Sequence, residues 1–128
     1  MQIDDLLTSH WLAFLAEARF ATLTTLGPHG APDSVPICFI VAGGVLWSPL
    51  DEKPKRSSDP RTLRRVRDLV RDPRAAILVH RWDEDWSKLA FVELRVVGRL
   101  VDPGGEGHAD AVAALRRKYA QYREHALE

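Results

Sequence analysis

Short apolar segments separated by glycine and proline turns fill the first half of the sequence and limit the chain to a strand-rich, antiparallel fold. Residues 20–26 are rich in Thr, Leu and Phe and end in the turn sequence Gly27–Gly30. The apolar segment 35–41 follows, and residues 42–44, with two glycines, separate it from the short segment 45–48. This spacing predicts a β-hairpin and a third strand that returns beside the second through a glycine turn.

Two further strands and three helices are expected from the remaining hydrophobic pattern. The strands span residues 75–82, a continuous apolar run, and residues 89–101, in which apolar and charged side chains alternate. Apolar residues at spacings of three and four predict amphipathic helices over residues 3–18, 63–70 and 112–122.

These elements predict an α+β fold, in which a small antiparallel, barrel-like sheet is flanked by helices. A length of 128 residues with 45% hydrophobic side chains fits one domain over residues 1–128. Pro36 lies inside the second strand and cannot donate a ladder hydrogen bond. An edge strand, a bulge and the approach of a ligand to the backbone therefore remain open at this position.

Charge and composition argue against several classes of protein. The 18 basic and 18 acidic residues give a net charge of zero, which disfavours a globally basic nucleic-acid-binding protein. No stretch approaches the roughly 20 apolar residues that cross a bilayer. The single Cys38 and the acidic, leaderless start lead us to expect a cytoplasmic protein without a membrane partner. The five histidines show no metal-ligand spacing, so no metal site is expected.

Positive charge concentrates between residues 53 and 74, where nine Lys and Arg residues stand against three Asp residues, a local net charge of +6. Basic side chains in a loop that enters a helix can bind a phosphate together with the helix N–H groups. An anion site and a solvated loop both remain open for Lys53, Lys55 and Arg56. The arginines further along the segment are expected to lie on a solvated helix surface.

Three tryptophans, Trp47, Trp82 and Trp86, lie at or just beyond predicted strand ends. Indole rings in such places can form the wall of a site for a flat aromatic ligand, and they also concentrate at dimer interfaces. The two interpretations are compatible. No nucleophile-elbow, P-loop or dinucleotide-binding motif occurs, and Cys38 in an apolar strand is expected to be inert.

Several motifs occur in an order that matches a known family. They are Ala21–Thr25, the turn Gly27–Gly30, Pro32 with Pro36–Phe39, Leu46–Ser48, Asp51–Arg56 and Asp72–Arg74. Together they resemble the pyridoxamine 5′-phosphate oxidase-like split β-barrel family. The loop Asp51–Arg56 and the acidic segment Asp83–Ser87 are similar to the coenzyme F-420-dependent (deazaflavin) oxidoreductase branch of actinobacteria.

The resemblance implies a homodimer with two cofactor sites at its interface, a basic loop that binds the cofactor phosphate and a second strand that borders the ring. By position, the phosphate ligands would be Ser48, Lys53, Lys55 and Arg56. The residues bordering the ring would be Val35, Pro36, Ile37 and Trp47, and Trp82 and Trp86 could reach the partner's site. The chain lacks the arginine-containing C-terminal extension of true pyridoxamine phosphate oxidases, which argues against oxidation of vitamin B6.

The local charge favours coenzyme F-420 over FMN, because F-420 carries a phosphodiester and a polyglutamate tail, whereas FMN carries one phosphate. The predicted function is an oxidoreductase that transfers a hydride between reduced F-420 and a planar conjugated small molecule of the quinone, tetrapyrrole or enone class. The alternatives are an FMN-binding split-barrel oxidoreductase and a non-catalytic flavin- or haem-binding module. The sequence assigns no catalytic residue.

Overall fold

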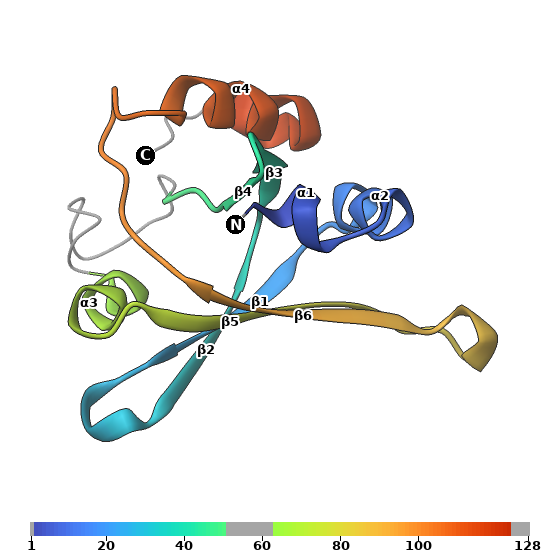
Figure 1. Cartoon of the computed structure of the whole chain (residues 1–128), viewed down its shortest axis with the longest axis horizontal. Helices are drawn as coiled ribbons and strands as arrows, with labels where there is room; N and C mark the ends of the chain where they lie inside the picture. The colour runs from blue at the N-terminus through green and yellow to red at the C-terminus, as the bar shows by residue number, and fades with distance from the viewer. Residues whose placement is uncertain (1, 51–62, 124–128) are drawn as a thin grey trace. The chain divides into compact units, whose positions relative to one another are not determined.

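The predicted hairpin forms one side of a four-stranded antiparallel sheet in the computed structural model, which describes residues 2–50 and 63–123. The strands lie in the order β2, β1, β5, β6 and are labelled in Figure 1, which views the sheet nearly edge-on. Their bounds are Ala21–Leu26 for β1, Pro32–Ile37 for β2, Arg74–Arg81 for β5 and Ala90–Val97 for β6. The sheet and α3 (Arg64–Arg71) belong to one of two units, made of residues 18–37 and 63–100.

The hairpin between β1 and β2 turns at a short 3₁₀ segment, η1 (Pro28–Gly30). His29 has φ of 66° and Gly30 has φ of 78°, so two successive residues adopt the left-handed conformation that reverses the chain. The Gly27 N–H donates to the Ala31 carbonyl at 2.7 Å and closes the turn. Pro36 lies in β2, an edge strand of the sheet, where its missing N–H is tolerated.

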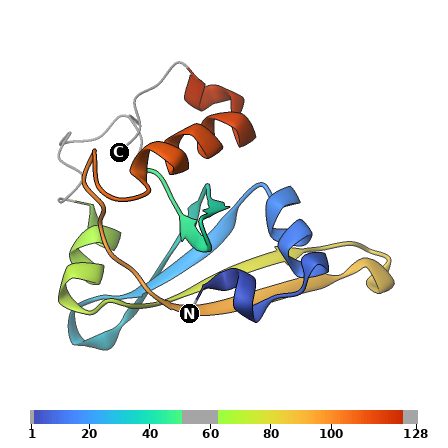
Figure 2. The same ribbon diagram turned by 45° about the horizontal axis from the view of Figure 1, so that its top comes forward.

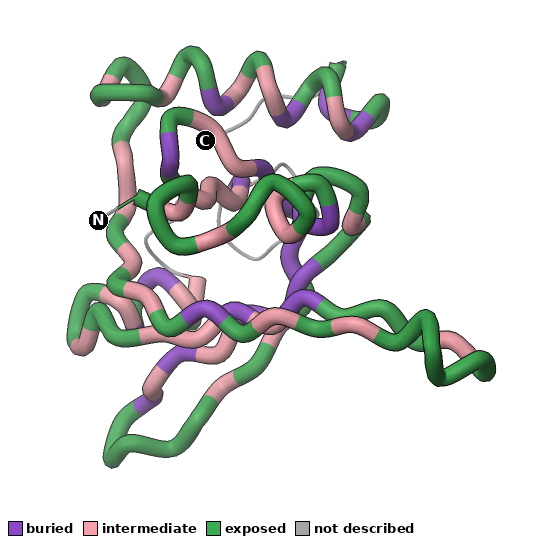
Figure 3. The backbone as a smooth tube through the Cα atoms, turned by 45° about the vertical axis from the view of Figure 1, so that its right-hand side comes forward, coloured by how far each residue is buried: buried purple, intermediate pink, exposed green. Residues whose placement is uncertain are grey.

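One face of the sheet is buried, and burial alternates along the strands as the sequence pattern predicts (Figure 3). The buried side chains of this face are Ala21, Leu23, Thr25, Ile37, Ile77, Val79 and Leu94. The last strand is shorter than predicted, because it ends at Val97 instead of continuing to Val101. Gly98 donates to the Pro73 carbonyl at 2.8 Å, and a Cβ there would meet the Leu69 side chain at 3.0 Å.

Helix α3 buries a different set of side chains from the one its hydrophobic spacing predicts. Val66 is buried, but Val70 is 79% exposed and the buried position is taken by Asp68, which is 1% exposed. The Thr25 hydroxyl on β1 donates to Asp68 Oδ2 at 2.7 Å, and Arg71 Nη1 lies 3.4 Å from Oδ1. A buried carboxylate is tolerated when it accepts such hydrogen bonds, and this polar contact orients the helix on the sheet.

The predicted second strand over residues 35–41 is wrong as a single element, because the chain leaves β2 at Ile37 and starts β3 (Ile40–Ala42) after Phe39. The third strand forms as β4 (Val45–Trp47) and pairs with β3 through the Gly43–Gly44 turn. These two strands make a separate two-stranded sheet, so the expected three-stranded meander is divided between two sheets.

The N-terminal helix is also divided, into α1 (Ile3–Leu6) and α2 (Ser9–Glu17). Leu7 is extended, with φ of −116° and ψ of 144°, and the Leu12 N–H bonds to the Thr8 carbonyl. Hydroxyl residues such as Thr and Ser favour a new helix start, which explains the interruption.

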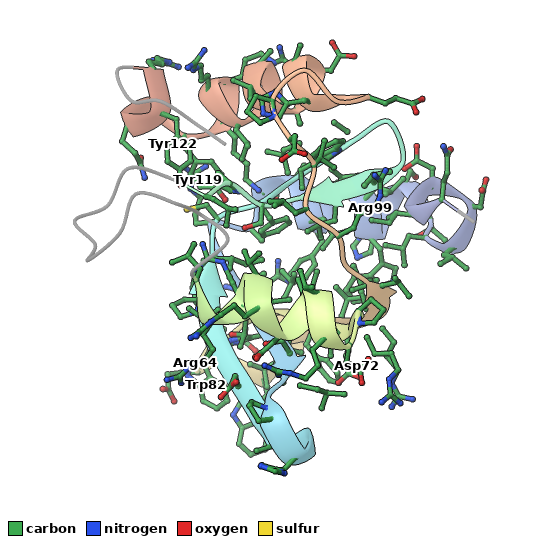
Figure 4. All side chains as sticks on the ribbon, turned by 90° about the vertical axis from the view of Figure 1, so that its left-hand side faces the viewer. Arg64, Asp72, Trp82, Arg99, Tyr119 and Tyr122 are labelled. Carbon is green, nitrogen blue, oxygen red and sulfur yellow. The ribbon has the colours of Figure 1, made fainter. Side chains whose placement is uncertain are left out.

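The C-terminal helix, α4 (His108–Lys118), ends earlier than predicted and continues as the 3₁₀ segment η4 (Ala120–Arg123). It packs along β3 within the second unit of the chain, formed by residues 2–17, 38–50 and 101–123 (Figure 2). The core of this unit consists of Ile40, Ala111, Leu115, Tyr119 and Tyr122. Tyr119 and Tyr122 are labelled in Figure 4 and are each 3% exposed. None of the described helices is long and apolar enough to cross a membrane.

Replacing Thr25 with Val should lower the free energy of unfolding by about 2 kcal/mol at neutral pH, because Asp68 would stay buried without its hydroxyl donor. Urea unfolding of the wild type and the variant measures this loss. Thr24→Val is the matched control: Thr24 lies on the opposite face of β1, where its hydroxyl bonds only to that of exposed Ser34, at 2.8 Å. Equal stability of the two variants would contradict the role given to Thr25.

The pair formed by Asp72 and Arg74 should make stability depend on pH at the acid end. Two side-chain hydrogen bonds from Arg74, at 3.0 and 2.7 Å, and one from its backbone N–H lower the pKa of Asp72 from 3.8 to about 2. The stabilisation is therefore complete above pH 3.8 and lost as the pH falls towards 2.

Asp72→Asn should consequently reduce the free energy of unfolding at neutral pH, and the difference from wild type should shrink as the pH falls through this range. Arg74→Gln should reproduce the same pH dependence, because it removes the same pair. Denaturant unfolding at a series of pH values measures both. A difference that stays constant down to about pH 2 would show that the pair is not formed in solution.

Candidate functional site

Trp47, at the end of β4, is held in one orientation by contacts within its own unit. Its indole Nε1 donates to the Ala42 carbonyl at 3.3 Å, across the β3–β4 hairpin. The six-membered ring lies against Gly107, where a Cβ would come within 2.8 Å of Trp47 Cζ2. Gly107 precedes α4 with φ of +80°, so only glycine provides both the backbone conformation and the space that the indole needs.

Two buried polar atoms follow directly after these two residues in the chain. Among the described residues, Ser48 Oγ and His108 Nε2 are the buried side-chain nitrogen and oxygen atoms that have no hydrogen-bond partner. The contact between Trp47 and Gly107 brings the stretches that carry them to the same part of the unit. Leaving a buried polar group unpaired costs roughly 1–3 kcal/mol, so such atoms mark places that a ligand or an ordered water completes.

The three residues predicted to border a cofactor ring, Val35, Pro36 and Ile37, lie on the edge strand β2 of the other unit. Val35 and Ile37 share one face of the strand, and Ile37 is 6% exposed. Pro36 lies on the opposite, exposed face. A ring beside this strand would therefore contact one face through Pro36 or the strand edge through the backbone, rather than all three side chains together.

Trp82 and Trp86 lie in the loop that joins β5 and β6, and they are 64% and 74% exposed. Trp82 Nε1 donates to Glu84 Oε1 at 3.3 Å. The acidic residues of this loop have local roles: Asp85 accepts from the N–H and hydroxyl of Ser87 and caps the 3₁₀ segment η3 (Trp86–Lys88). These hydrogen bonds from Ser87 lower the pKa of Asp85.

A row of exposed rings crosses the sheet next to this loop and was not predicted. Phe20 packs edge-to-face on His80, with ring centroids 6.1 Å apart, and His80 is paired in register with Phe91 on β6. Phe20 and Phe91 are 50% and 67% exposed. The sequence places all three residues in predicted strands. It does not predict that they align, because their alignment depends on the strand register, which spacing alone does not give.

Of the predicted phosphate ligands, Ser48 directly follows β4, and Lys53, Lys55 and Arg56 lie outside the described residues. Further along the basic segment, arginines are paired with aspartates: Arg64 with Asp33 at 3.7 Å, Arg71 with Asp68 and Arg74 with Asp72 (Figure 4 labels Arg64 and Asp72). Within the described ranges, no group of His, Cys, Asp and Glu residues could hold a metal ion.

Asp33, Asp68 and Thr25 form a second polar cluster that the sequence did not reveal. The hydrogen bond between Asp33 and the accepting Asp68 carboxylate, followed by burial, raises the pKa of Asp33. The hydrogen bonds that Asp68 accepts from Thr25, Asp33 and Arg71 lower the pKa of Asp68 despite its burial. The cluster connects β1, β2 and α3 within one unit, which accounts for it as a structural contact.

The sequence does not single out His108 among the five histidines, and its Nε2 atom is buried. Its position gave one indirect signal: the glycine-rich break Gly104–Gly107 directly precedes the last helix. That pattern predicts a turn but does not show that the following imidazole is buried.

Comparison with known proteins shows what the chain is similar to. Residues 7–127 match the family model described as pyridoxamine 5′-phosphate oxidase. The solved structure of the conserved hypothetical protein Rv2991 from Mycobacterium tuberculosis superposes with a TM-score of 0.72 at 23% identity, covering 93% of this chain and 69% of that one. No curated protein sequence matches the chain.

Two further solved structures have the same fold. HutZ, the haem storage protein of Vibrio cholerae, gives a TM-score of 0.69 at 14% identity, over 94% of this chain and 78% of its own. An F-420 reductase gives 0.64 at 18% identity, over 89% and 79%. These likenesses confirm the predicted α+β class, an antiparallel split-barrel sheet with flanking helices.

Substituting Gly107 by Ala should destabilise the chain more than the same change at Gly104, by about 1–3 kcal/mol. Both glycines have similar positive φ values, +80° and +84°, so both alanines carry the same backbone strain. Only at Gly107 does the added Cβ meet the Trp47 ring, because nothing lies within 4 Å of a Cβ at Gly104. Denaturant unfolding compares the two variants, and equal losses would show that the Trp47 contact is not formed.

Proposed function

Because the chain belongs to the pyridoxamine 5′-phosphate oxidase family, we propose that it is an oxidoreductase that transfers a hydride between reduced coenzyme F-420 and a planar conjugated small molecule. The substrate class is a quinone, tetrapyrrole or enone. The bound coenzyme supplies the hydride, and the protein supplies binding, orientation and exclusion of water.

The observation that carries the choice of coenzyme is the charge of the basic segment. The pairs with Asp33, Asp68 and Asp72 already use positive charge between residues 63 and 74. The proposal therefore assigns the anionic part of the ligand to Lys53, Lys55 and Arg56, which precede α3. Three basic residues within four positions suit a phosphodiester with a polyglutamate tail better than a single phosphate.

The residues of the described part fit a planar ligand with polar edges. The indole of Trp47 is held in place by its hydrogen bond to Ala42. Ser48 Oγ and His108 Nε2 are buried without hydrogen-bond partners, and the polar edge of such a ligand would supply them. The family resemblance separately proposes the edge strand β2 as a border of the ring, through Pro36 on its exposed face or through the backbone of its edge.

A homodimer with its cofactor sites at the interface is part of the proposal. Trp82 and Trp86 are 64% and 74% exposed in the single chain. In the proposed dimer the partner subunit would cover these side chains, or they would reach into its cofactor site. A monomer at micromolar concentration would contradict this arrangement.

Two alternatives rest on specific observations. FMN would replace F-420 if the basic loop binds only one phosphate. A non-catalytic haem- or flavin-binding module is supported by the similarity to HutZ, whose structure is described as that of a haem storage protein.

Equilibrium binding of F-420 and FMN, followed by the fluorescence of each ligand, tests the proposal. F-420 should bind more tightly, and Lys55→Ala or Arg56→Ala should weaken its binding by roughly 1.5–3 kcal/mol, because each removes a charge-assisted hydrogen bond. Arg67→Ala is the matched control, since Arg67 is an exposed arginine of the same segment. Tight FMN binding with weak F-420 binding would select the flavin alternative, and unchanged affinity in both loop variants would remove the phosphate assignment.

A further inference from the structure

We propose that Ser48 and His108 form a two-point hydrogen-bonding subsite beside Trp47, and that this subsite binds an uncharged oxygen, a carbonyl or hydroxyl, of a planar aromatic ligand. The inference deepens the proposed function, on which it rests for the kind of ring that is bound. It adds His108, which neither the sequence motifs nor the family resemblance assigns, and it gives Ser48 a partner other than phosphate.

The subsite is inferred first from two buried polar atoms. Ser48 Oγ and His108 Nε2 are buried without a hydrogen-bond partner among the described residues. A serine hydroxyl and an imidazole nitrogen can each donate or accept one hydrogen bond. Together they suit a ligand atom that accepts two hydrogen bonds, or a neighbouring donor and acceptor.

The indole of Trp47 supplies the aromatic surface of the proposed subsite. Trp47 precedes Ser48, its ring rests on the residue before His108, and its N–H is already used by the Ala42 carbonyl. The indole therefore offers its apolar surface to a ligand and no hydrogen bond. The inference places both unsatisfied polar atoms at the border of this aromatic surface, an arrangement that binds a flat ring by stacking and orients it through its polar edge.

The local charge favours an uncharged ligand atom at this subsite. Glu106 and Asp110 flank His108 within two residues, and both are exposed. Asp110 lies in the first turn of α4, and the helix start carries no side-chain cap. These carboxylates offset the partial positive charge of the helix start and make the position less favourable for a phosphate than for a carbonyl or hydroxyl.

Riboflavin is the probe, because it has the fused ring and the hydroxyl chain but no phosphate. Ser48→Ala and His108→Phe should each weaken riboflavin binding about three- to tenfold, measured by fluorescence titration, since each removes one hydrogen bond. Ser9→Ala and His10→Phe are matched controls in the same unit, because both residues are exposed in α2 and should leave binding unchanged. Without ligand, Ser48→Ala should keep or raise the stability of the protein, because the removed hydroxyl has no partner.

A second readout follows the imidazole itself. Addition of riboflavin should shift the His108 Nε2 resonance in ¹⁵N NMR spectra, and inorganic phosphate should not. If phosphate shifts it and riboflavin does not, the subsite binds the anion and the proposal is wrong. If neither ligand shifts it and both variants bind riboflavin normally, a water fills the place and the proposal is wrong. If His108→Phe weakens riboflavin binding while F-420 binds only weakly to the wild type, the subsite is upheld and only the choice of coenzyme is overturned.

Discussion

The buried backbone of Phe39 is the constraint on which the unit of α2, β3, β4 and α4 depends. The chain breaks its extended path between β2 and β3 at this residue, and the Phe39 side chain is 0% exposed. The Tyr119 hydroxyl accepts from the Phe39 N–H at 3.2 Å, and Lys118 Nζ donates to its carbonyl at 3.0 Å and lies 4.0 Å from the ring centroid. If these backbone groups were buried without partners, each would lower the free energy of unfolding by roughly 1–3 kcal/mol. Because α4 has to end where Lys118 and Tyr119 reach Phe39, its start, with Gly107 and His108, is fixed beside Trp47.

The sequence predicted the elements whose signals are local. The Gly27–Gly30 turn, the alternation along β6 and the apolar spacing of α4 depend on neighbours within a few residues, and all three features are present. The division of the second strand was not predictable in this way, because the groups that replace the ladder at Phe39 come from residues about eighty positions away. The burial of Asp68 in place of Val70 has the same origin: its partner Thr25 lies 43 residues earlier in the chain.

The same limit applies to the candidate site, whose ligand-binding role stays a prediction. Strand-end tryptophans and a basic loop can be recognised in sequence, and Trp47 and Ser48 do lie at the end of β4. His108 could not be recognised as a site residue, because its place near Trp47 depends on a tertiary contact between Gly107 and that indole, sixty residues earlier in the chain. Local charge excess was also an incomplete guide, since Arg71 and Arg74 neutralise neighbouring aspartates and offer little to a ligand. A charge count becomes informative only after the internal pairs are known.

The account combines a family fold, a basic loop for the anionic end of a coenzyme and an aromatic, hydrogen-bonding place for uncharged ring atoms. Its central claim is hydride transfer from reduced F-420, and the most direct measurement is the oxidation of protein-bound reduced F-420 by a naphthoquinone, followed by the absorbance of the oxidised deazaflavin. The account predicts that oxidation accelerates in proportion to the protein concentration and saturates with the quinone. Oxidation at the same rate as that of the free coenzyme, with the coenzyme demonstrably bound, would contradict the claim and leave a binding protein.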